Sequence, residues 1–205
     1  MNTRDYIRSR REYFLNNISE FRDSNGLLVH FIPSCDIKGI IDFENNEIQE
    51  KLMHRLRYYL TGSTKSVKDN LFIINLKNKH NIICSNNGQI ELFQAGISKV
   101  NQLDTTLKTI RIEDIYLKAR RFSEIVELIK TDYSIECDIE MSFSLIGVHG
   151  SYLISFDSRK INPDPLLTDI VMLPSLTIPK NEITNLMIVL KKHFMEGNIL
   201  LTEDL

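Results

Sequence analysis

The spacing of apolar residues predicts four helices. Apolar side chains recur at intervals of three and four, with charged residues between them, in residues 4–22, 45–60, 112–130 and 179–197. The first stripe is interrupted at Arg11, and Asn45 or Asn46 is placed to cap the second helix. Pro179 suits the start of the last helix because the first helical turn needs no N–H donor there.

Other stretches follow strand patterns. Residues 27–32 are a continuous apolar run, which is typical of a buried strand. Residues 136–148 alternate between apolar and polar, as a half-buried strand does, and residues 152–156 are predicted to pair back on them as a hairpin. Pro174 interrupts the run at 171–178, so that strand is predicted to lie at a sheet edge.

Three short β-rich runs predict a meander, at residues 70–76, 81–85 and 89–93. Asn87 and Gly88 both tolerate the positive φ of a type I′ turn, so they are predicted to join the last two runs as a hairpin. Residues 107–112 would extend the meander. Residues 61–66 end like a phosphate-binding loop but follow a helix and lack its other glycine, so we interpret them as a polar turn.

The order of these elements favours one fold class. Strands come in meanders rather than in strict βαβ alternation, which predicts an α+β domain. Its sheet would be mostly antiparallel or mixed and covered by about four helices. Residues 1–205 are predicted to form a single domain, and a division near residues 100–106 is the main alternative.

Composition and charge narrow the protein classes. The chain has 205 residues, of which 42% are hydrophobic and 25% charged, an ordinary globular balance that excludes wholesale disorder and a disulfide scaffold. A formal net charge of -2 excludes a uniformly basic nucleic-acid-binding protein, although a local basic patch stays open. No apolar run approaches the roughly 18 residues of a membrane span, so no membrane partner is predicted.

The cysteines and the N-terminus bear on the compartment. Cys35, Cys84 and Cys137 are odd in number and far apart, unlike a secreted disulfide framework. The charged N-terminus has no apolar core of the kind a signal peptide needs. The sequence therefore predicts a cytoplasmic protein with reduced thiols.

Basic side chains gather in three places. They are Arg4, Arg8, Arg10 and Arg11 in the first helix, Lys51, Arg55, Arg57, Lys65 and Lys68 in and after the second, and Lys118, Arg120 and Arg121 in the third. Such clusters can hold a phosphate backbone by counterion release, so the first two are candidate nucleic-acid-binding sites. Solvated helix faces produce the same pattern more often.

Signals for catalysis are sparse. The phosphate-loop, dinucleotide-binding, zinc-protease and serine-hydrolase motifs are all missing, so no cofactor and no catalytic residue is predicted. His149 between Gly147 and Gly150 is a candidate ligand-binding turn, because glycines allow a ligand to approach closely, although a structural turn explains it as well. Asp138 and Glu140 could serve a metal-dependent nuclease, yet a solvated strand face accounts for them.

Several segments, taken in order, resemble one known region. They are the arginine-rich helix at residues 4–15, Leu27-Leu28-Val29-His30-Phe31-Ile32-Pro33, the strand at 69–74, the hairpin at 83–91, Ser144-Leu145-Ile146-Gly147-Val148-His149-Gly150-Ser151-Tyr152-Leu153, and the stretch at 162–171. This series is similar to the region that follows the Schlafen-type AlbA ("divergent AAA") domain in bacterial ATP-binding proteins. The AlbA domain itself is absent, and so is the Trp-Asn-rich stretch usual before the strand at 69–74.

The resemblance implies an accessory function. It suggests a non-catalytic adaptor subunit of a prokaryotic nucleic-acid-related complex, for example in antiphage defence, whose protein partner supplies ATPase or nuclease chemistry. Direct DNA or RNA binding through the basic helices is the first alternative. A metal-dependent nuclease with an unrecognised site is the second.

Overall fold

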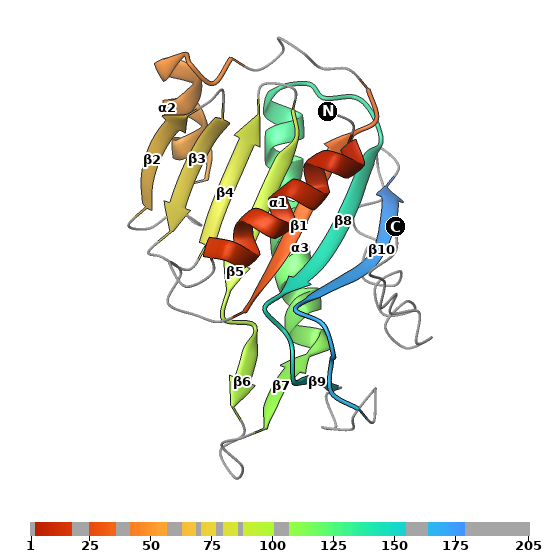
Figure 1. Ribbon diagram of the computed structural model, residues 1–205. Coiled ribbons are helices and arrows are strands. Elements are labelled where there is room, and N and C mark those ends of the chain that lie inside the picture. The colour runs from red at the N-terminus through yellow and green to blue at the C-terminus, as the bar shows by residue number, and fades with distance from the viewer. Residues whose placement is uncertain are drawn as a thin grey trace.

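The computed structural model describes residues 3–17, 25–35, 42–56, 63–68, 71–76, 80–85, 88–100, 107–154 and 164–178. These residues form a large sheet, a small sheet and three helices (Figure 1). Within these ranges no helix combines the length and apolar character needed to cross a membrane.

The large sheet has seven strands, and every neighbouring pair is antiparallel. Across the sheet the strands are β10 (Ile170–Ile178), β8 (Ile139–Ile146), β1 (Gly26–Pro33), β5 (Ile90–Ala95), β4 (His80–Ser85), β3 (Leu71–Leu76) and β2 (Ser63–Lys68). Strands β2 to β5 are a meander, and Gly88, with φ of 76°, lies in the connection between β4 and β5. Helices cover both faces of the central strand β1. This explains why its residues form a continuous apolar run rather than an alternating one.

The small sheet continues from the lower end of the large one in Figure 1. Its strands are β6 (Ser98–Val100), β7 (Lys108–Arg111) and β9 (Ser151–Ile154), with β7 and β9 parallel. The buried Asn25, just before β1, accepts hydrogen bonds from the backbone N–H groups of Ile97 and Ser98, each at 2.9 Å. This side chain therefore ties the start of β1 to the start of the small sheet.

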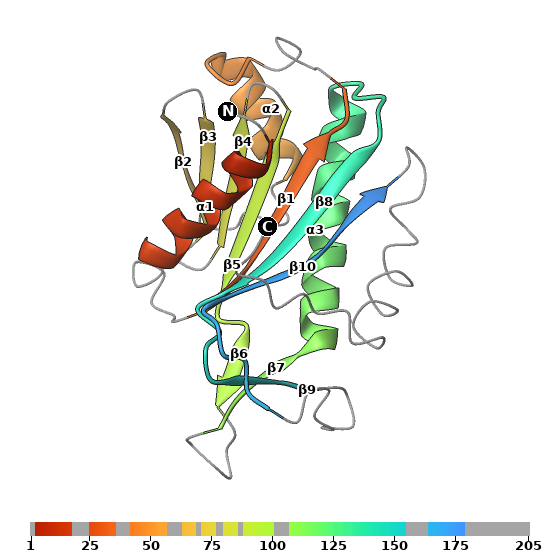
Figure 2. The ribbon, with the colours of Figure 1, turned by 45° about the vertical axis from the view of Figure 1, so that its right-hand side comes forward.

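The helices lie on opposite faces of the large sheet. Helix α1 (Thr3–Asn17) covers one face, and α2 (Asn46–Arg55) and α3 (Ile112–Asp132) cover the other, as the two views show (Figures 1 and 2). Side chains alternate along β1, so Leu27 and Val29 pack with α3 while Leu28 faces α1. Asn45 caps α2 as predicted, since its Oδ1 accepts the Glu47 N–H at 2.8 Å.

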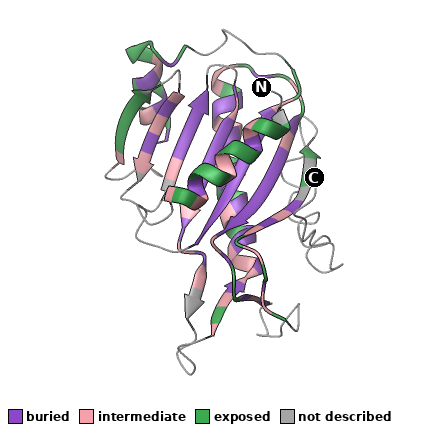
Figure 3. Ribbon diagram, viewed as in Figure 1, coloured by how far each residue is buried: buried purple, intermediate pink, exposed green. Residues whose placement is uncertain are grey.

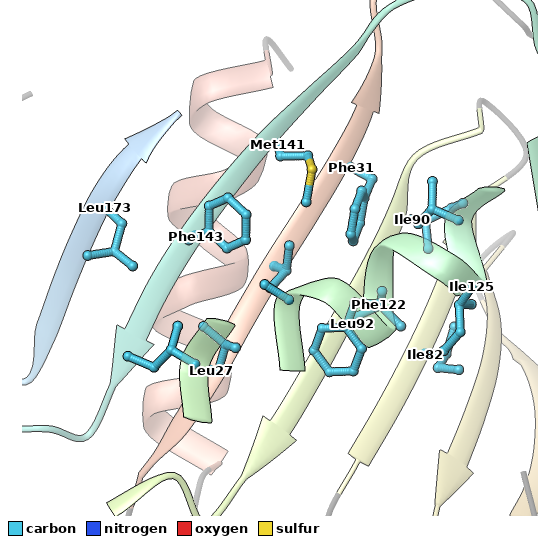
Figure 4. Close-up of a cluster of buried hydrophobic side chains, with 14 of the residues drawn as sticks. Leu27, Phe31, Ile82, Ile90, Leu92, Phe122, Ile125, Met141, Phe143 and Leu173 are labelled. Carbon is cyan, nitrogen blue, oxygen red and sulfur yellow. The ribbon is translucent and has the colours of Figure 1, made fainter. Parts of the chain in front are cut away.

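The larger core lies between the sheet and α3 (Figure 4). Phe31, Phe143 and Leu92 are almost completely buried there, against α3 residues that include Phe122 and Ile125. Full burial of one such side chain stabilises the fold by about 1.5–3 kcal/mol. This core also contains Ile110 and Leu153 of the small sheet, so one apolar cluster joins both sheets.

The core on the α1 face is smaller. The ring of Phe14 stacks on that of Phe93 with centroids 4.3 Å apart, and Leu28 packs beside them. A Cβ at position 26 would overlap the Phe93 ring, so Gly26 is required for this approach. Figure 3 shows the result: α1 turns exposed positions outward over buried strands.

The predicted α+β class and the largely antiparallel sheet are confirmed. Three of the predicted helices are present, while the fourth, at 179–197, lies outside the described residues. The alternative division near residues 100–106 also lies outside them, except for Val100, which ends β6. The interpretation of residues 61–66 as a turn is wrong for residues 63–66, because Ser63–Lys68 is the edge strand β2, while residues 61–62 lie outside the described part of the chain. The side chains of an exposed edge strand need not alternate between apolar and polar, so the residue pattern of β2 does not indicate a strand.

The predicted hairpin partner of β8 is also wrong. Strand β9 pairs with β7 in the small sheet, because both sides of β8 are occupied by β1 and β10. Strand β10 does lie at the sheet edge, and its pairing shifts register between Leu173 and Leu176, around Pro174.

The expectation of three reduced thiols is wrong for two of them. Cys35 and Cys137 form a disulfide, with Cα atoms 6.0 Å apart. The antiparallel register of β1 and β8 pairs Pro33 with Ile139, and the Ser34 N–H donates to the Asp138 carbonyl at 2.9 Å. Cys35 and Cys137 are the next residues beyond this backbone hydrogen bond. The pairing of β1 with β8 therefore brings the two cysteines together, although they lie far apart in the sequence.

Reduction of this disulfide is expected to lower the free energy of unfolding by about 2–4 kcal/mol, because the bridge closes a long loop in the unfolded chain. The separation of the two cysteines is 102 residues. Urea unfolding with and without a reductant measures the change. A Cys35→Ser/Cys137→Ser variant should be insensitive to reductant, and equal midpoints for the wild-type protein in both buffers would contradict the expectation.

Candidate functional site: a polar cluster beneath α1

Helix α1 directs two arginines toward the sheet. Ile7 and Phe14 are buried seven residues apart, and Arg10 and Arg11 lie between them on the same helical face. The interruption of the apolar stripe at Arg11 thus marks side chains that enter the interface with the sheet. Long arginine stems can pack on apolar surface while their guanidinium groups reach polar partners.

Arg10 forms a buried ion pair with Glu91 of β5. Its Nη2 lies 2.8 Å from Glu91 Oε1 and its Nε 2.9 Å from Oε2, so the pairing is bidentate. His30 Nε2 of β1 lies 3.4 Å from the same Oε2, within ion-pair distance but outside hydrogen-bond geometry. Tyr6 meets the His30 ring edge-on, with centroids 6.2 Å apart.

The surroundings of these groups shift their pKa values. Burial alone would raise the pKa of Glu91, but the interactions with His30 and Arg10 outweigh it, so the pKa lies below its usual value. Burial also acts to lower the pKa of Arg10, and Glu91 more than offsets that effect. Burial and the charge of Glu91 raise the pKa of Tyr6. The cluster therefore favours charged Glu91 and Arg10 beside a neutral phenol.

Arg11 contacts a second set of partners on β8 and β10. Its Nε donates to Ser144 Oγ at 2.6 Å and its Nη2 to Ser142 Oγ at 3.1 Å. Its Nη1 lies 2.6 Å from the thioether sulfur of Met172. Burial lowers the pKa of Arg11 to about 10, because no carboxylate offsets the desolvation. The fork of Arg11 thus connects α1 to two strands through uncharged groups.

Three side chains of this cluster form a row across neighbouring strands. The strand register places Glu91 beside His30 and His30 beside Ser142. A carboxylate, an imidazole and a hydroxyl are the groups used in nucleophilic catalysis, which needs a hydrogen bond between base and nucleophile. Among the described residues neither His30 nitrogen has a partner in hydrogen-bond geometry, and all three residues are at most 2% exposed. The row is closed to a substrate in this conformation.

The predicted basic site on α1 is only partly on the surface. Arg4 and Arg8 are exposed, and Arg8 pairs with Glu12 one helical turn away, with its Nε 3.4 Å from Oε1. Arg11 instead points into the interface with the sheet, so the three candidate residues do not form one exposed basic face. The reason is the helical period, which places Arg11 on the side of Ile7 and Phe14.

The second predicted basic site pairs its charges within the chain. Arg55 Nε lies 3.4 Å from Asp132 Oδ2, and Lys65 pairs with Glu50. Lys51 lies over the Tyr133 ring, with its Nζ 5.5 Å from the centroid. Arg57 and the side chain of Lys68 fall outside the described part of the chain. Because α2 lies across the sheet from α1, the two basic sites do not merge.

The glycine turn has a structural explanation. Gly147 and Gly150 have φ of 68° and 75°, and their N–H groups donate to the carbonyls of Asp169 and Leu166 at 2.6 and 2.8 Å. His149 is exposed at the tip of this turn. The two glycines thus serve a turn anchored on the segment before β10.

Only one of the two acidic residues of the nuclease alternative lies within a strand. Asp138 precedes β8, which begins at Ile139 and contains Glu140. Over the described ranges, no group of three or more His, Cys, Asp or Glu side chains is placed to hold a metal ion.

Sequence reasoning missed most of the polar cluster. His30 lies in the predicted buried strand at 27–32, and the sequence pattern does not single out Glu91 or Ser142, because each stands among the apolar residues of a strand. A signal was present in the residue types, since a charged residue inside a buried strand requires a partner. The interruption of the apolar stripe at Arg11 is a second sign, because it places a charged residue on the helical face that packs on the sheet.

Acid is expected to weaken the protein through Glu91. Because its folded-state pKa lies below the usual 4.5, its stabilising contribution is complete above that value and is lost as the pH falls toward the folded-state pKa. One proton bound on unfolding changes the free energy of unfolding by about 1.4 kcal/mol per pH unit. Urea midpoints between pH 3 and 7 measure this slope. It should be smaller in Glu91→Gln, and an equal slope would contradict the assignment.

Comparisons of the chain with protein families, with curated proteins and with solved structures found no match. The resemblance to the region that follows the AlbA domain therefore stays a prediction.

Proposed function

We propose that this chain is a non-catalytic accessory module that acts through a protein partner in a prokaryotic nucleic-acid-related complex. The observation that carries the proposal is the burial of the polar side chains that resemble a catalytic set. The row that combines a carboxylate, an imidazole and a hydroxyl, as nucleophilic catalysis requires, is closed beneath α1, with Glu91, His30 and Ser142 each at most 2% exposed. The partner would supply the ATPase or nuclease chemistry.

The distribution of basic side chains supports an adaptor over direct nucleic-acid binding. A nucleic-acid interface needs several unpaired cations on one face. Arg4 and Arg8 lie on the α1 face, whereas Lys51 and Arg55 lie across the sheet. Asp132 and Glu50 also pair with Arg55 and Lys65. Neither of the two candidate basic sites therefore offers a long, unpaired basic stripe among its described residues.

The experiment is isolation of the tagged protein from its native host, with nuclease treatment before size-exclusion chromatography. A stoichiometric protein partner that persists after the treatment is expected. Loss of all association on nuclease treatment would contradict the proposal, because it would show that nucleic acid was the link.

Fluorescence anisotropy with labelled DNA and RNA tests the alternative on the isolated chain. At physiological salt we expect only the weak affinity of non-specific contacts, with dissociation constants no lower than about 10⁻⁶ M. Tight binding that Arg4→Ala/Arg8→Ala or Lys51→Ala/Arg55→Ala weakens, with a reduced salt dependence, would instead establish direct nucleic-acid binding.

A further inference from the structure

Arg11 is a half-buried cation whose partners are all uncharged. Ser144, Ser142 and Met172 occupy its Nε, Nη2 and Nη1 positions. Its neighbour Arg10 differs, because the buried Glu91 neutralises it through a bidentate pair. Burial of a charge is costly unless a charge of opposite sign compensates it. The contrast singles out Arg11 as an arginine that has no counter-ion among the described residues.

The acidic residues nearby do not supply that counter-ion. Glu12, the next residue of α1, pairs outward with Arg8. Glu140 stands two residues before Ser142, on the same face of β8, and no ion pair joins it to Arg11 among the described contacts. Arg10 and Arg11 thus bring two positive charges to the cluster against the single negative charge of Glu91. A surplus of positive charge remains at Arg11.

We propose that Arg11, Ser142 and Ser144 form a binding site for a tetrahedral oxyanion, a phosphate group above all. The guanidinium fork can donate two parallel hydrogen bonds to such a group, and the serine hydroxyls can turn to donate as well. These donors come from α1 and from one strand of the sheet, and the hydroxyl-bearing residues are buried and fixed. The proposal does not depend on the adaptor function.

Met172 is the group that the anion would displace. Its thioether is a weak acceptor on a flexible side chain, so replacing it at Arg11 Nη1 with an anionic oxygen gains a stronger hydrogen bond. Met172 is only partly buried and belongs to β10, which is an edge strand with an irregular register. The anion would therefore enter from the β10 side of α1.

Isothermal titration calorimetry with inorganic phosphate tests this site, with sodium chloride keeping the ionic strength constant. The wild-type protein should show one saturable site, for which sulfate competes and acetate competes less well. Arg11→Gln should weaken phosphate binding by about tenfold or more, because a hydrogen bond to a charged group is lost. The matched control is Arg8→Gln, an exposed arginine on the same helix, which should bind as the wild type does.

Two further variants keep the test decisive. If Arg11→Gln fails to fold, Ser142→Ala retains the guanidinium and should still weaken phosphate binding severalfold. Met172→Ala should preserve or strengthen binding, because it removes the group to be displaced. Absence of saturable phosphate binding by the wild-type protein, or equal affinity in Arg11→Gln and Arg8→Gln, would overturn the proposal.

Discussion

Replacement of Glu91 with alanine is expected to lower the free energy of unfolding by about 3–5 kcal/mol. Glu91 is 2% exposed and binds Arg10 with both carboxylate oxygens. Without it, Arg10 stays in a largely buried position with no charge to balance its own. Urea unfolding followed by circular dichroism measures the loss.

The matched control is Glu12→Gln, which removes a carboxylate from an exposed ion pair on α1, the helix that carries Arg10. Such a pair contributes about 0.3–0.5 kcal/mol, so this variant should unfold close to the wild type. An Arg10→Met/Glu91→Leu variant should recover much of the stability lost in Glu91→Ala, because neither charge then remains alone. A loss in Glu91→Ala no greater than that in Glu12→Gln would contradict the assignment.

Phe14→Ala is expected to have a comparable effect, a loss of about 3–5 kcal/mol. The Phe14 side chain is fully buried, stacks on Phe93 and belongs to the smaller core between α1 and the sheet. Its removal would leave a cavity against the Phe93 ring. Chemical unfolding, monitored in the far ultraviolet, measures the loss.

Leu117→Ala is the control for apolar truncation in a helix. Leu117 is 55% exposed on α3, so its removal should change the free energy of unfolding by about 0.5 kcal/mol or less. Equal losses in Phe14→Ala and Leu117→Ala would show that α1 does not pack on the sheet as described.

The strongly patterned segments of the fold could be predicted from the sequence. The period of apolar residues located α3, and the continuous run at 27–32 located the central strand β1. The edge strand β2 could not be predicted, because its exposed side chains do not alternate between apolar and polar. The pairing of β9 with β7, across a long separation in sequence, depends on which strand edges are free and is not encoded locally.

The candidate site was harder to predict, because its residues come together only through strand register. Arg10 and Glu91 are 81 positions apart, and Arg11 and Ser144 are 133 apart. The basic residues of α1 were recognised as a group, but the helical period divides them between solvent and sheet. Arg8 can be assigned to the solvent side and Arg11 to the sheet side only when it is known that α1 lies on this face of the sheet.

Hydrogen exchange measured by mass spectrometry tests most directly whether the buried polar cluster holds α1 on the sheet. The account predicts that Glu91→Ala speeds amide exchange in residues 3–17 while α3 keeps its wild-type protection, because the larger core does not involve Glu91. Unchanged exchange in α1, or equal acceleration in α1 and α3, would contradict it.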